Sequence, residues 1–315
     1  KHQDATKRFQ AIRNLILVEA NSSLAHIIPL LNDSDSKVRH AAFLALELLE
    51  HPNPLDEILP FLKGTQDQQG YALDYLEKLH KAEVTPQLLP FLTSKDAKLK
   101  IRTLEVLGSL GNSEIAPALR PLFKDAETEV WVALLKTMTQ LKIENFEETM
   151  MALNDPDLTV REAALDYHLT IDPENKVLIP NITNLLQDLE GNIQLKTIQL
   201  LKRCGQGEPS VIEALIPLLQ EREELYFETV DTLSTFDALL LKNSNLFPHL
   251  VTGLEAVPTL KPEEVILLEK IITPAHLPAL FEIFSKKLTS IFQNVYDDPK
   301  TYQAMSTPII HFFKQ

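Results

Sequence analysis

The chain has 315 residues, of which 44% are hydrophobic, so it is long enough to form two globular domains or one elongated array. Its formal net charge is −14, from 30 Lys and Arg against 44 Asp and Glu. An acidic surface repels phosphate backbones and anionic membranes, which argues against a general nucleic-acid binder. No apolar run approaches the ~18 residues of a transmembrane helix, which argues against direct membrane insertion.

Glycine is scarce, with 8 residues, whereas 20 prolines are spread along the chain. This composition is typical of short helices that start and stop often. The single cysteine, Cys204, excludes a disulfide within the chain and favours a reducing compartment. We therefore expect a cytoplasmic protein or a cytosolic domain. Because Lys1 is not an initiator methionine, we expect the chain to be processed or cut from a larger protein.

Residues 4–20 at the N-terminus read as an amphipathic helix, and from there a period of about 31 residues runs to the end of the chain. Each unit contains an apolar segment, often Pro-Leu-Leu or Pro-Phe-Leu, followed by a polar turn. These segments begin at Pro29, Pro60, Pro90, Pro121, Met151, Asn184, Pro217, Pro248, Pro278 and Pro308, at steps of 31, 30, 31, 30, 33, 33, 31, 30 and 30 residues.

Each unit is predicted to form two helices. The first is short and kinked by its proline, and the acidic turn after it caps a longer second helix. In the first unit Val38, Ala42, Ala45, Leu46 and Leu49 share one helix face. A single pair of helices leaves such a stripe exposed, whereas stacked pairs bury it continuously.

The pattern changes towards the C-terminus, and residues 307–315 read as a first helix without its second. We expect residues 1–244 to form regular repeats and residues 245–315 to form divergent repeats of the same solenoid. The incomplete units at both ends suggest that other parts of a larger protein continue or cover the stack.

The segment Asp33-x-Asp35-x-x-Val38-Arg39-x-x-Ala42-x-x-Ala45-Leu46 resembles the HEAT repeat, in the short variety found in bilin-lyase-type arrays. The segment from Asp155 to Ala164 matches it as well. The resemblance implies an all-α, right-handed α-α superhelix of the HEAT-like or ARM type, with about ten helix pairs. It implies little about function, because such arrays mostly act as binding surfaces.

In HEAT arrays the acidic turn and the arginine that follows it form a ladder between repeats. This ladder position here is occupied by Arg39, Gln69, Lys100, Trp131, Arg161, Gln194 and Tyr226. Two aromatic residues therefore replace the basic one. Trp131 and Tyr226 either pack against the adjacent turn or stand exposed as anchors for a partner.

Solenoids bind partners along the inner surface lined by their second helices. Two residues after the small core position, the units present mostly acidic residues. After Leu44 in the first unit, the series continues with Asp74, Glu105, Lys136, Asp166, Gln199 and Asp231. This row predicts either a negative concave groove for a basic or extended peptide, or an ordinary solvated helix face.

No phosphate-binding loop or HExxH helix occurs in the sequence, and we predict no catalytic residue, metal or cofactor. His168 lies at a core position and is expected to be a buried histidine, with a titrating or ligating role as the alternative. The leading interpretation is a non-catalytic scaffold that binds another protein on its concave face. The alternatives are a regulatory or linker module of a larger transporter or signalling protein, whose flanking domains are its partner, and a HEAT-like enzyme or nucleic-acid binder.

Overall fold

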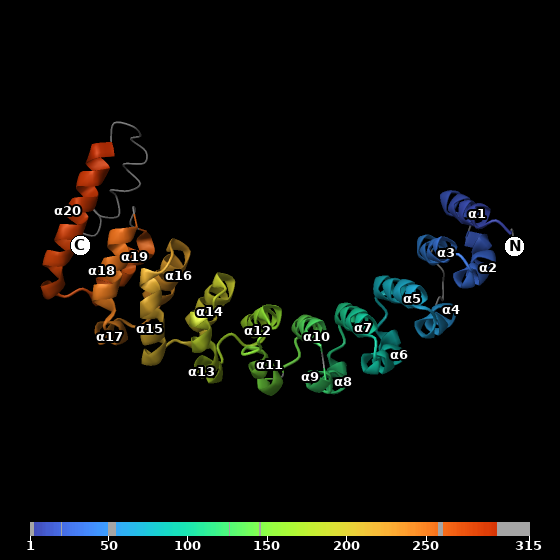
Figure 1. Cartoon of the computed structure of the whole chain (residues 1–315), viewed down its shortest axis with the longest axis horizontal. Coiled ribbons are helices and arrows are strands. Elements are labelled where there is room, and N and C mark those ends of the chain that lie inside the picture. The colour runs from blue at the N-terminus through green and yellow to red at the C-terminus, as the bar shows by residue number, and fades with distance from the viewer. Residues whose placement is uncertain are drawn as a thin grey trace. The chain divides into compact units, whose positions relative to one another are not determined.

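The computed structural model describes residues 3–19, 21–49, 55–125, 127–144, 146–257 and 261–294. The chain divides into two compact units, residues 1–145 (unit 1) and 146–315 (unit 2). All regular elements in the described part are helices. In each unit the longer second helices lie along one side and the short first helices along the other (Figure 1).

In unit 1 the second helices are α1 (Ala5–Leu17), α3 (Ser36–Leu48), α5 (Gln66–Leu79), α7 (Ala97–Leu110) and α10 (Thr128–Leu141). The first helices are α2 (Leu24–Ile27), α4 (Leu55–Ile58), α6 (Thr85–Leu88), and α8 (Ala116–Leu119) with α9 (Leu122–Asp125). Consecutive second helices pack against each other from α1 to α10. This stacking confirms the all-α, HEAT-like fold class.

In unit 2 the second helices are α12 (Leu158–Ile171), α14 (Gly191–Cys204), α16 (Glu223–Ser234) and α19 (Pro262–Ile271). The first helices are α11 (Phe146–Ala152), α13 (Ile179–Ile182), α15 (Pro209–Leu215), and α17 (Ala238–Lys242) with α18 (Leu246–Ala256). Helix α20 (Leu277–Asn294) follows α19. The predicted first helix at 307–315 lies outside the described residues.

Most of the short first helices continue into a five-residue 3-10 segment, namely η2 (Ile28–Asn32), η3 (Leu59–Lys63), η5 (Leu89–Thr93), η8 (Thr183–Gln187) and η9 (Ile216–Gln220). Proline stands near the start of four of these segments, where its missing N–H removes one i→i−4 hydrogen bond. Segment η8 has no proline; there the hydroxyl of Thr183 donates to the carbonyl of Ile179 at 3.0 Å.

The predicted core stripe is buried. In α3, Val38, Ala42, Ala45 and Leu46 are 0% exposed, because α1 and α5 pack on either side. The turn before each second helix also behaves as predicted. Asp35 accepts hydrogen bonds from the backbone N–H groups of Lys37 and Val38, which otherwise have no partner in the first helical turn. The corresponding caps of α1, α7 and α12 are Asp4, Asp96 and Asp157.

Candidate functional site

The predicted ladder joins neighbouring repeats through arginine. The guanidinium of Arg39 donates to the carbonyls of Asp33, at 2.7 Å, and Ser34, at 3.2 Å, in its own turn. It also forms an ion pair with Asp67 of the next repeat. A hydrogen bond from Thr65, together with the one from Arg39, lowers the pKa of Asp67 to about 2. One side chain thus fixes its own turn and holds the neighbouring one.

Arg161 repeats this geometry in unit 2. It donates to the carbonyls of Asp155, at 2.9 Å, and Pro156, at 3.0 Å, and it pairs with Asp188 at 2.8 Å. In the described part of the chain, the glutamines at ladder positions form hydrogen bonds to the turn before their own helix and none to the next repeat. Gln69 donates to the carbonyl of Leu62 at 3.1 Å, and Gln194 makes the equivalent bond to Leu186.

The ladder begins one repeat earlier than the sequence analysis placed it. Arg8 on α1 makes a two-pronged pair with Asp33, with both N–O distances at 2.7 Å. Arg8 precedes Arg39 by 31 residues and follows the capping Asp4, so the repeat period is the signal from which Arg8 could have been identified. Unit 1 therefore has a complete ladder joint between α1 and the first full repeat.

The two aromatic residues at ladder positions differ. Trp131 is half-buried, and its ring packs edge-on against Phe123 at a centroid distance of 5.0 Å. Tyr226 is 2% exposed, and its hydroxyl donates to the carboxyl group of Glu264 at 2.6 Å. The expectation of an exposed aromatic anchor is therefore wrong for Tyr226, because its ring lies in the core and its hydroxyl has an internal partner.

A glycine makes room for the Tyr226 ring. A Cβ atom at Gly253 in α18 would lie 2.3 Å from the ring of Tyr226 and 2.7 Å from the carbonyl of Leu219. Glu264 is 0% exposed and also accepts the backbone N–H of Lys261 at the start of α19. Burial raises the pKa of Glu264, against the opposing effect of the hydrogen bond from Tyr226. Tyr226 thus connects α16 to both α18 and α19.

The residues of the predicted binding row all lie on second helices, and we call the surface that they form the second-helix face. Five of its six positions are exposed, namely Asp74, Glu105, Lys136, Asp166 and Gln199, and Asp231 is half-buried. The row divides between the two units, with the first three residues in unit 1 and the last three in unit 2.

Most carboxylates of this row pair with a cation on the neighbouring second helix. Asp74 pairs with Arg102 at 2.7 Å, Asp166 with Lys196 at 2.6 Å, and Asp231 with Lys202 at 2.5 Å. Each of these cations lies three residues from a position in the row, but the spacing within one repeat did not predict their pairing across helices. The negative charge of the face is therefore smaller than the row alone suggests.

Two clusters keep an excess of carboxylates. Arg102 is the shared partner of Asp74, Glu77 and Glu105, at 2.7, 2.5 and 3.0 Å. Burial alone lowers the pKa of Arg102, but its hydrogen bonds with these carboxylates outweigh burial and raise it. We call these four residues the Arg102 cluster; its formal charge is −2. In unit 2, Lys196 serves two carboxylates, those of Glu162 and Asp166.

Apolar surface lies beside the Arg102 cluster. On α3, Leu44 and Leu48 are 37% and 53% exposed, one helical turn apart on the second-helix face. Between α5 and α7 the face has a hollow of about 220 Å³. It lies where Gly70 has no side chain and has Leu73, Leu99 and Arg102 in its lining.

Two further titratable side chains, those of His168 and Cys204, are buried in unit 2. His168 is fully buried, hydrogen bonds to the backbone of Thr149, and has a pKa that burial lowers to about 4. Burial raises the pKa of Cys204 to about 11. The described residues hold no group of three or more His, Cys, Asp or Glu placed to bind a metal, and none of their helices is long and apolar enough to cross a membrane.

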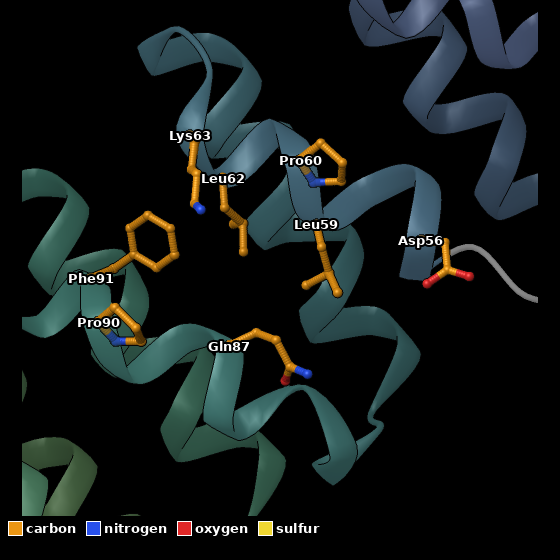
Figure 2. A pocket seen from close by; sticks show the side chains of 8 residues that line it. All are labelled: Asp56, Leu59, Pro60, Leu62, Lys63, Gln87, Pro90 and Phe91. Atoms are coloured by element: carbon orange, nitrogen blue, oxygen red, sulfur yellow. The ribbon is translucent and has the colours of Figure 1, made fainter.

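A second hollow lies on the side of unit 1 formed by the first helices. It runs between α4 with η3 and α6 with η5 and has a volume of about 690 Å³ (Figure 2). Its lining consists of Asp56, Leu59, Pro60, Leu62, Lys63, Gln87, Pro90 and Phe91.

No protein-family model matches the sequence, and no curated protein matches it. Known structures do resemble the fold. A chain in a homology model of the full-length AP-3 complex has a TM-score of 0.64 at 13% identity, aligned over 94% of this chain and 58% of that one. YibA from Escherichia coli has a TM-score of 0.55 at 14% identity over 82% and 92% of the two chains.

Kap95p, from a structure of its binding to RanGDP, has a TM-score of 0.53 at 15% identity. This chain aligns over 92% of its own length and 46% of that of the Kap95p structure. The chain thus spans about half the length of two of these proteins. At these identities the similarity concerns the fold. The chain has the fold of the HEAT- and ARM-type helical solenoids.

Proposed function

We propose that this chain is a non-catalytic scaffold that binds another protein on its second-helix face. The observation that carries the proposal is the excess of carboxylates around Arg102. Asp74 and Glu105 remain 55% and 51% exposed although both contact this cation. A partner that brings cations can pair with them from solvent without displacing an existing contact. The expected partner is therefore a basic segment of a protein.

The apolar surface beside the cluster defines this partner further. Protein interfaces combine an apolar centre with a polar rim. Leu44 and Leu48 supply the apolar part on α3, and the hollow beside Gly70 accepts a side chain between α5 and α7. A basic segment that also carries leucine-sized side chains matches both features, whereas a uniformly charged one matches only the Arg102 cluster.

The similar structures support a protein partner in general terms. AP-3 is a protein complex, and Kap95p binds RanGDP. We further propose a cytosolic location, which the single cysteine of the chain, Cys204, supports because proteins of reducing compartments rarely contain disulfides.

One observation favours the alternative in which the partner belongs to the same polypeptide. Leu17 and Val18 at the end of α1 are 75% and 71% exposed, next to the second-helix face. In this alternative a flanking domain of the same polypeptide covers Leu17 and Val18. The array is then a regulatory or linker module of a larger protein.

Charge reversal tests the proposed face. We expect Asp74→Lys, Glu105→Lys and Asp166→Lys together to weaken binding of lysine-rich amphipathic peptides by more than about tenfold, since attraction becomes repulsion. The matched control reverses the exposed Glu83, Glu114 and Glu213 on the first-helix side, which changes the net charge equally. Equal affinity of the two triple variants for the peptides, measured by fluorescence polarisation, would exclude the second-helix face as the site.

A further inference from the structure

The groove between α4 with η3 and α6 with η5 lies apart from the second-helix face. Its volume of about 690 Å³ is within the range of ligand-binding pockets in proteins. Figure 2 shows Leu59 and Pro60 on one wall and Pro90 and Phe91 on the other, with Gln87 between them. Because proline has no N–H, the walls expose few backbone donors at this point, and the surface is mainly apolar.

Phe91 is the aromatic residue left uncovered in this groove. The equivalent residue of the preceding repeat, Phe61, is 7% exposed and packs edge-on against Phe43 at 5.3 Å. At the position of Phe43 the next repeat has Leu73, a smaller side chain without an aromatic ring. Phe91 is only half-buried, and one edge of its ring lines the groove. A large apolar group from another molecule gains contact area with it that the repeat itself does not provide.

Opposite charges mark the two ends of the groove. Asp56 lies at one end and Lys63 towards the other (Figure 2). Both are exposed, and within the described part of the chain neither has an ion-pair partner. They are seven residues apart along α4 and η3, which corresponds to about 10–14 Å. An extended chain covers that distance in about three or four residues.

Gln87 adds a hydrogen-bonding group between the two ends. With its amide oriented so that the NH₂ group donates to the carbonyls of Val84, at 2.9 Å, and Glu83, at 3.0 Å, its Oε1 remains as an acceptor. An extended peptide has unpaired backbone N–H groups that suit such an acceptor.

We propose that this groove binds a short extended peptide with a large apolar side chain between one basic and one acidic residue, three or four positions apart. The apolar side chain packs on Phe91 and Leu59, the basic residue pairs with Asp56, and the acidic residue pairs with Lys63. This site is independent of the second-helix face, so the array has one docking surface on each side of unit 1.

The proposal can be tested with fluorescein-labelled heptapeptides. Each peptide carries one arginine, a central leucine or phenylalanine, and one glutamate, and both sequence orders are used. We expect fluorescence polarisation to show saturable binding that is lost when the central residue is serine. We expect the Lys63→Glu variant to bind the peptide with one arginine and one glutamate about five- to tenfold more weakly than the wild-type chain does. A second peptide, in which arginine replaces the glutamate, should bind this variant more tightly than it binds the wild-type chain. The gain for the second peptide is a result that damage to the fold cannot produce.

The matched control is Lys95→Glu, which reverses an exposed lysine outside the groove and is expected to leave both affinities unchanged. Absence of saturable binding, or equal affinities in Lys63→Glu and the wild type, would overturn the proposal. A change in oligomeric state of Lys63→Glu, measured by sedimentation, would also overturn it in favour of a second copy of this chain as the occupant. The variants Asp74→Lys and Glu105→Lys leave this binding intact, so failure at one face is distinguishable from failure at the other.

Discussion

At the position where Arg39 and Arg161 bridge neighbouring repeats, Tyr226 makes a different bridge. The arginines reach an aspartate in the next turn, whereas the tyrosine hydroxyl reaches Glu264, 38 residues along the chain. The repeat period predicted that Tyr226 occupies the ladder position. It did not predict burial, since the space for the ring depends on Gly253 and the partner lies beyond the next first helix.

The Tyr226 hydroxyl contributes to stability because Glu264 is buried. We expect Tyr226→Phe to lower the free energy of unfolding by about 1–3 kcal/mol, since the carboxyl group loses a hydrogen-bond donor in the core. Tyr71→Phe serves as the control, because the Tyr71 hydroxyl makes only a 3.4 Å contact with Ser36 near the surface. Urea unfolding measures both. An equal loss in the two variants would contradict a special role for the buried pair.

His168 makes stability depend on pH. Its pKa is about 4 in the folded chain, against an ordinary value of 6.5, so between these values the unfolded chain binds a proton that the folded chain does not. The stabilisation is complete above pH 6.5 and falls as the pH decreases, by about 3 kcal/mol at pH 4.

We expect His168→Leu, which introduces the residue that Leu46 and Leu107 supply in other repeats, to remove this part of the pH dependence. The exposed His40 provides the control substitution, His40→Gln. Urea unfolding at a series of pH values measures the effect. The same decline from pH 6.5 to 4 in wild type and His168→Leu would show that other groups cause it.

At the scale of elements, the joints between repeats decide how the second helices are held. The sequence predicted the capping aspartates, because a cap depends on residues within one turn. The ladder between repeats was expected from the resemblance to HEAT arrays. The sequence did not predict the cation partners of Asp74, Asp166 and Asp231, because these depend on how adjacent helices are placed. The acidic row was therefore visible in the sequence, and its partial neutralisation was not.

Arg161 is expected to be the most sensitive ladder residue in unit 2. Arg161→Ala removes two hydrogen bonds to turn carbonyls and leaves the buried carboxylate of Asp188 without its partner, which costs about 2–4 kcal/mol of unfolding free energy. Arg161→Lys should recover only part of this loss, since one ammonium group lacks the planar fork. Arg203→Ala, at an exposed pair with Glu174 of 3.7 Å, should cost less than about 0.5 kcal/mol. Similar losses for Arg161→Ala and Arg203→Ala in denaturant unfolding would refute the ladder as a structural joint.

At the scale of the whole molecule, the sequence predicted the fold class from its period, since stacked repeats of one design repeat the same contacts. The change from regular repeats in residues 1–244 to divergent repeats in residues 245–315 stays a prediction. Helices α18 and α20 are longer than the four-residue first helices of earlier repeats, such as α2 and α6. In both helices the proline stands in the first turn of a long α-helix, where its missing N–H costs little. Function depends instead on surfaces that vary between repeats, such as the Arg102 cluster and the groove beside Phe91, and these required coordinates.

The measurement that tests the central claim most directly is the salt dependence of peptide binding to the wild-type chain. If the second-helix face binds a basic segment through the Arg102 cluster, the affinity for lysine-rich amphipathic peptides should fall by more than about tenfold between 50 and 500 mM NaCl, since salt screens exposed charges. The variant Asp74→Asn, Glu105→Gln should bind more weakly at low salt and show a flatter dependence. An affinity independent of ionic strength, or the same dependence in wild type and variant, would contradict the account.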